Sequence, residues 1–154
     1  MRAAFLMGLV GGQRAMTPLA TVAIAAARGE LPDDNGAPAL LSYPVVVAGA
    51  ALLAVGEMAG DKQVTAPDRI VPVGLVARFA TSAIAGMALV PRRRRWLGAA
   101  VGGATAVVAS YPGWRARCAA MARFGQTPTG FVEDAAVVAG AAAVVRTLPG
   151  QDAG

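Results

Sequence analysis

The first apolar run of the chain, residues 3–27, contains a single charged residue, Arg14, near its middle. The run is long enough to cross a bilayer, which requires about 20 residues. A charge at the centre of a bilayer costs about 2.5–3.5 kcal/mol on insertion scales, so Arg14 marks a candidate functional site. Glycines precede this residue, and Thr17 and Pro18 follow it. The sequence therefore predicts a helix that is broken or kinked over residues 14–18.

The composition favours a membrane protein. Of the 154 residues, 56% are hydrophobic and 15% are charged, whereas soluble domains carry about 25% charged residues. The net charge is +5, but the arginines flank apolar segments, as topology signals do, so nucleic acid is not an expected partner. The chain has one cysteine and no histidine. It therefore lacks a cysteine cluster and the commonest metal ligand. No spacing of its acidic residues specifies a cation site, so neither a metal nor another cofactor is expected.

Five apolar segments alternate with polar connectors. Each is long enough to cross a bilayer, the last one only just. We expect an all-α integral membrane protein with a compact bundle of about five transmembrane helices, the first broken near Arg14. It would form one domain over residues 1–148 with a flexible tail over 149–154, span the bacterial cytoplasmic (inner) membrane several times and contact membrane lipids. The segments are residues 3–27, 37–56, 70–91, 96–114 and 130–147, the fourth continuing to residue 121.

Basic residues in the connectors do not decide the orientation of such a bundle. Five spans would place six lysines and arginines on each side, so the count is a tie. Either the compact arginine block at residues 92–95 dominates and faces the cytoplasm, or the bias is weak. The block could also contact anionic lipids.

Five spans would bring most of the ionisable groups near span ends to one face of the bundle. Charges inside membranes usually face the interior and pair with one another, so Arg14 and Arg78 should pair with carboxylates. Thr17 and Pro18 have the residue types of a helix N-cap and first turn. A helix that restarts there would direct its positive end into the membrane interior. The expected carboxylate partners are Glu57, Asp61, Glu133 and Asp134.

Several of these residues resemble the signatures of a known family. Residues 12–18, Gly-Gln-Arg-Ala-Met-Thr-Pro, are similar to the G-x-R-S-x-T-P signature of small bacterial membrane proteins called domain of unknown function 4126. Ala15 replaces the signature serine, and Val64 replaces a proline of a second signature. The resemblance implies a multi-span membrane protein without an established activity. Its other matching residues are Asp61, Lys62, Pro67, Arg69, Pro72, Gly74, Leu75, Arg78, Tyr111, Arg115, Glu133, Asp134 and Ala135.

Two functions remain open. The protein could be a transporter or channel-like protein for a small ion, a proton or an anionic solute, and a homo-oligomer would help so small a bundle to enclose a pathway. It could instead be a structural or assembly subunit whose ion pairs only fix helix packing. An enzyme is not expected, because no nucleophile motif or metal-ligand cluster is present. The candidate ligand-binding residues are Arg14, Thr17, Glu57, Asp61, Lys62, Arg69, Arg78, Arg115, Glu133 and Asp134.

Overall fold

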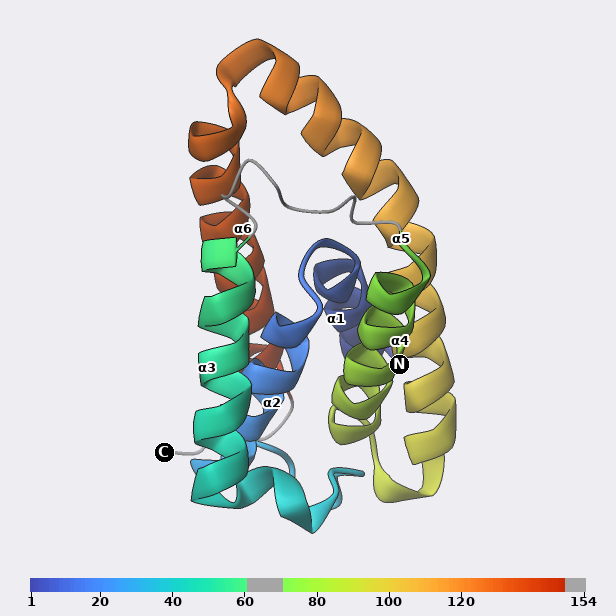
Figure 1. The fold of residues 1–154 in the computed structure, drawn as a ribbon. Coiled ribbons are helices and arrows are strands. Elements are labelled where there is room, and N and C mark those ends of the chain that lie inside the picture. Colours follow the sequence, from blue (N-terminus) through green and yellow to red (C-terminus); the bar gives the residue numbers. More distant parts are fainter. Residues whose placement is uncertain (61–70, 149–154) are drawn as a thin grey trace.

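A computed structural model describes residues 1–60 and 71–148, and this part of the chain is helical, without β-strands. The prediction of an all-α fold is therefore confirmed. Two short 3-10 helices, η1 and η2, lie in the connections between α2 and α3 and between α4 and α5 (Figure 1). The elements are α1 (Arg2–Gln13), α2 (Met16–Ala27), η1 (Ala39–Ser42), α3 (Pro44–Gly60), α4 (Pro72–Ala88), η2 (Arg92–Arg94), α5 (Arg95–Phe124) and α6 (Gln126–Arg146).

The first apolar run forms two helices, and the predicted break between them is confirmed. Arg14 has an extended backbone, with φ −137° and ψ 122°, and it ends α1. Ala15 already has helical angles, and α2 begins at the next residue. One extended residue between two helices is enough to change the direction of the chain, because its backbone dihedral angles lie far from the helical region.

The two halves of this run point in opposite directions. Gly8 lies against Thr105, and Gly12 lies against Ala109, so α1 runs parallel to α5. Ala20 of α2 packs on α3. The backbone of Met16, at the start of α2, meets α3 near its carboxyl end, so α2 runs antiparallel to α3. The run is therefore a helical hairpin with Arg14 at its tip, and the prediction of one kinked span over residues 3–27 is wrong in this respect (Figure 1).

The remaining helices alternate in direction around this hairpin. α1 packs against α4 and α5, whereas α2 packs against α3, so the hairpin lies between these helices. We call the end that holds the start of α1 and the ends of α2, α4 and α6 the base end. The opposite end, where α3 and α5 finish, is the tip end. The predicted segments 70–91, 96–114 and 130–147 each correspond to one helix, α4, α5 and α6, whereas segment 37–56 begins with a loop and η1 before α3.

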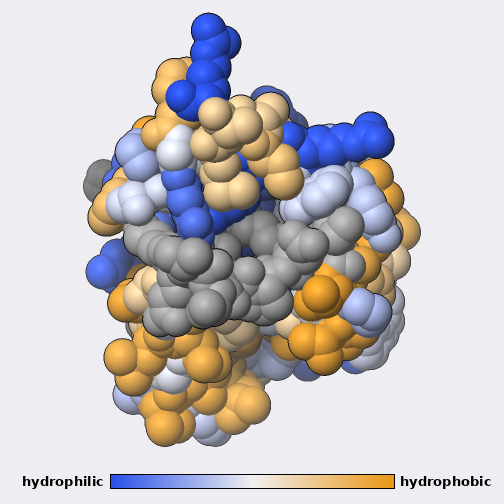
Figure 2. All heavy atoms as spheres, turned by 45° about the horizontal axis from the view of Figure 1, so that its top comes forward, coloured by the Kyte–Doolittle hydropathy of each residue, from blue (hydrophilic) through white to orange (hydrophobic). Residues whose placement is uncertain are grey.

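Many large apolar side chains are exposed in this fold, although others, such as Met7, Val22 and Leu41, are buried in its core. In α3, Val45, Leu52 and Val55 are 77%, 73% and 65% exposed, while the buried residues are alanines. The buried polar side chains include three arginines and one aspartate. Arginine and aspartate are almost never fully buried unless they are paired, and Arg14, Asp134 and Arg117 each belong to an ion pair. Apolar side chains cover the flanks below the hydrophilic tip end in Figure 2.

Helix length and composition support fewer membrane-crossing helices than the five that the sequence predicted. Within the described residues, one helix, α6, is both long and apolar enough to cross a membrane. The helices α2, α3 and α4 are apolar but shorter, with 12, 17 and 17 residues.

Candidate functional site

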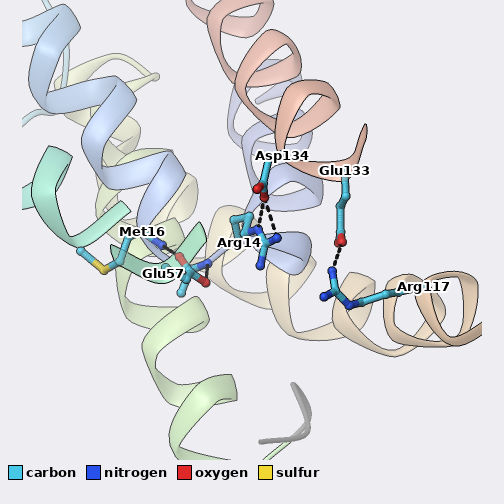
Figure 3. A network of polar contacts seen from close by, with 7 residues as sticks. Arg14, Met16, Glu57, Arg117, Glu133 and Asp134 are labelled. Atoms are coloured by element: carbon cyan, nitrogen blue, oxygen red, sulfur yellow. Dashed lines mark hydrogen bonds and ion pairs between the residues drawn. The ribbon is translucent and has the colours of Figure 1, made fainter. Parts of the chain in front are cut away.

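Arg14 forms a buried ion pair with Asp134 of α6. The side chain of Arg14 is 1% exposed. Its Nε donates a hydrogen bond to Oδ1 of Asp134 at 2.8 Å, and its Nη2 lies 2.5 Å from the same oxygen. Asp134 lies eight residues after the first residue of α6, which is about 12 Å along a helix. The pair therefore joins the tip of the hairpin to α6 inside the bundle (Figure 3).

Glu57 of α3 caps the start of α2. Its Oε1 accepts a hydrogen bond from the N–H of Ala15 at 2.8 Å, and its Oε2 accepts one from the N–H of Met16 at 2.8 Å. The first N–H groups of a helix have no partner within the helix, and the helix dipole is positive there. A carboxylate satisfies both needs at once, so the start of α2 holds an anion of the protein itself. That this helix end points into a membrane stays a prediction.

The predicted capping role of Thr17 is wrong. α2 begins at Met16, so Thr17 is its second residue and Pro18 its third, and no side chain of the helix caps its start. Oγ1 of Thr17 is buried and has no hydrogen-bond partner among the described residues. The physical reason is that an N-cap threonine accepts the N–H of the second or third residue after it. In a helix that begins at Met16, the N–H groups of Leu19 and Ala20 already bond to backbone carbonyls one turn earlier.

A second ion pair joins α5 to α6. Nη1 of Arg117 donates a hydrogen bond to Oε2 of Glu133, and the side chain of Arg117 is 6% exposed. The candidate set contained Arg115, which is exposed. Arg117 follows Ser110 by seven residues and so lies on the same helix face, but only the structure shows that this face is buried.

Arg78 lies beside the hairpin tip. It is 4% exposed in α4 and is one turn before Ser82, whose hydroxyl contacts Gly11 of α1. This places Arg78 at about the level of Arg14, as helical rise requires. The predicted residues Asp61, Lys62 and Arg69 lie outside the described residues.

Among the described residues, this site contains equal numbers of positive and negative side chains. We call the set Arg14, Glu57, Arg78, Arg117, Glu133 and Asp134 the tip cluster. It contains three arginines and three carboxylates, supplied by the hairpin and by all four surrounding helices. Two hydroxyls close to it, those of Thr17 and Ser82, are buried without a hydrogen-bond partner in residues 1–60 and 71–148. The arrangement can hold the hairpin in place, because its ion pairs and the Glu57 cap join the hairpin to the surrounding helices.

Comparisons with family models, with curated proteins and with solved structures found no match to this chain. The resemblance to domain of unknown function 4126 therefore stays a prediction.

Proposed function

We propose that this is an integral membrane protein in which α3, α4, α5 and α6 cross the bilayer and the hairpin of α1 and α2 enters it from the base end. The exposed apolar side chains of α3 and the buried arginines support this arrangement, because lipid hydrocarbon solvates apolar side chains and does not solvate charged ones. Trp96 and Trp114 lie 18 residues apart on α5, about 27 Å along a helix. Membrane interfaces favour tryptophan and lie about 30 Å apart, which fits this spacing.

The function that the geometry supports best is passage of a small ion across the membrane, and the hairpin tip would form the ion site. The observation that carries it is the position of the tip. α1 has 12 residues, so the tip would reach about 18 Å into the membrane from the base end. Non-helical backbone at such depth is tolerated where it is buried in protein or lines a polar cavity. Broken helices of this kind form the solute sites of several transporters.

A proton is a better candidate than an anionic solute. The start of α2 would attract an anion, but Glu57 already accepts hydrogen bonds from its N–H groups. An anion would have to displace this carboxylate. A proton requires only a carboxylate as its carrier, and the tip cluster supplies Glu57, Glu133 and Asp134 in a chain without histidine.

A structural or assembly role is the second candidate. The observation that favours it is the closure of the ion pair at the tip, since Arg14 is 1% exposed and bonded to Asp134. Such a pair can hold the hairpin without any ligand.

Proton flux in liposomes tests these two functions. The variant Arg14→Leu/Asp134→Leu should stay folded, because replacing both members of a buried pair by apolar residues is often neutral. If the tip cluster carries protons, this variant loses flux that the parent protein shows. The control Arg28→Gln/Glu30→Gln removes an exposed pair at the base end, 3.7 Å apart, and should keep full flux. Absence of proton flux with the parent protein would reject the passage and leave the structural role.

A further inference from the structure

Four consecutive arginines, Arg92–Arg95, form a concentrated positive charge at the base end. They occupy η2 and the first residue of α5. The dipole of a helix is positive at its start, so cations are unfavourable there. Within residues 1–60 and 71–148, none of the four forms an ion pair with a carboxylate. An anion beside these arginines would relieve their mutual repulsion.

The backbone holds this cluster in a defined position. The N–H of Arg92 donates to the carbonyl of Asp34 at 2.6 Å, and the N–H of Gly36 donates to the carbonyl of Val90 at 2.8 Å. A Cβ added to Gly36 would lie 2.7 Å from the Cβ of Arg95, so the loop after α2 packs directly against the cluster. The four arginines therefore lie on a turn whose backbone is held in place by hydrogen bonds and packing.

A cavity of about 410 Å³ opens beside these arginines. Arg92, Arg95 and Trp96 line it together with Met87 and the small residues 36–39. The guanidinium of Arg95 lies 5.2 Å from the centre of the Trp96 ring, which orients it next to the cavity. Apolar surface continues past the cavity on the neighbouring η1, where Leu40 is 59% exposed. A ligand with an anionic head and an apolar tail matches this combination.

We propose that the cavity binds the headgroup of an anionic phospholipid, with its phosphate between Arg92 and Arg95 and its acyl chains along the apolar surface at Leu40 and Trp96. Guanidinium groups bind phosphate with two parallel hydrogen bonds. Basic residues beside a membrane attract anionic lipids, each by about a factor of five in affinity. The site rests on the membrane placement proposed above and is independent of the tip cluster.

Quenching of Trp96 fluorescence tests the site. The chain has two tryptophans, so Trp114→Phe leaves Trp96 as the reporter. The protein in neutral detergent is titrated with phosphatidylglycerol or phosphatidylcholine that carries brominated chains, and the midpoint of quenching is compared. We expect the phosphatidylglycerol midpoint to be at least tenfold lower. The variant Arg92→Gln/Arg95→Gln should raise it about thirtyfold, which is the factor for two basic residues.

The control variant Arg115→Gln/Arg123→Gln removes two exposed arginines at the tip end and should leave the midpoint unchanged. Inorganic phosphate, which lacks acyl chains, should not compete at millimolar concentration. Equal midpoints for the two lipids, or full competition by phosphate, would overturn the lipid site. Fractionation of cells separates this failure from failure of the membrane proposal, because a protein absent from the membrane fraction contradicts both, whereas a membrane-bound protein without lipid preference contradicts the lipid site alone.

Discussion

At the scale of single residues, Glu57 of α3 caps the start of α2, whereas a helix start is usually capped by a side chain of its own segment. A carboxylate from another helix accepts the N–H groups of Ala15 and Met16. α3 packs on α2 and η1 among the described elements, so these bonds also help to attach α3 to the bundle. The start of α2 and the position of α3 therefore depend on the same side chain.

Replacement of Glu57 by alanine should destabilise the protein by about 2–4 kcal/mol, because two partly buried N–H groups lose their acceptor and each would cost about 1–3 kcal/mol if fully buried. Glu57→Gln should cost less, since its amide oxygen still accepts one bond. Thermal unfolding in detergent measures both. Glu30→Gln, in the exposed pair with Arg28, is the control and should change stability by less than about 0.5 kcal/mol. Equal effects of Glu57→Ala and Glu30→Gln would show that the cap does not stabilise the fold.

Arg117 and Arg115 form a matched pair for a second prediction. Arg117→Gln leaves the carboxylate of Glu133 without its cation in a mostly buried position, where its side chain is 14% exposed. Loss of one partner of a buried pair costs about 3–5 kcal/mol, and the partial exposure of Glu133 puts the expected value near the lower limit. Arg115→Gln removes an exposed charge and should stay within about 0.5 kcal/mol of the parent. The same unfolding assay checks both, and a larger effect at Arg115 would restore it to the site.

The members of the tip cluster were largely predictable, but their pairing was not. Arg14, Glu133 and Asp134 stand out because charges in apolar segments must be buried and paired. Which carboxylate meets Arg14 depends on the direction of the hairpin, because the two residues are 120 positions apart. The resemblance directed attention to Arg115, whereas the structure buries Arg117 on the helix face that it shares with Ser110.

At the scale of elements, hydropathy could not distinguish a hairpin from a span. Residues 3–27 have the length and composition of one membrane-crossing helix, and the reversal depends on one residue with an extended backbone. Glycines make the hairpin possible, because Gly8, Gly11 and Gly12 let α1 approach α4 and α5 closely. Glycine spacing in the sequence shows that close packing is possible, but it does not identify the partner helix.

The contact between α4 and α5 gives a third prediction. A Cβ at Gly98 would lie 2.5 Å from the carbonyl oxygen of Gly86, so two backbones touch here without side chains between them. Gly98→Ala should cost about 1–3 kcal/mol, the usual effect of overpacking. Gly49→Ala is the control in α3, where an added Cβ meets nothing within 4 Å. It should stabilise the helix by about 0.5–1 kcal/mol, so the two variants should move the unfolding temperature in opposite directions.

At the scale of the whole molecule, the hairpin changes the topology count. Because α1 and α2 return to the base end, Arg2 joins Arg28, Arg92–Arg95 and Arg146 there, and the base end holds seven basic residues. The tip end holds three in the described chain, and five if Lys62 and Arg69 are both assigned to it. The five-span prediction gave equal numbers of basic residues on the two sides, and the hairpin removes this equality. An excess of basic residues marks the cytoplasmic side of a membrane protein. Under the proposed membrane placement, the base end faces the cytoplasm.

Labelling of single cysteines provides the fourth prediction and separates the hairpin from a fifth span. Cys118 is the one native cysteine, so Cys118→Ala gives a background without thiols. In that background, Arg2→Cys and Asp33→Cys should react with a membrane-impermeant maleimide in inside-out vesicles. Ala122→Cys, near the tip end of α5, should react in intact cells. A five-span bundle would place Arg2 on the same side as Ala122, because a full span separates Arg2 from Asp33, whereas a hairpin returns the chain to the side on which it entered. Reaction of both Arg2→Cys and Ala122→Cys in intact cells would therefore contradict a re-entrant hairpin in the membrane. Reaction of every position from both sides would indicate that the protein inserts in two orientations.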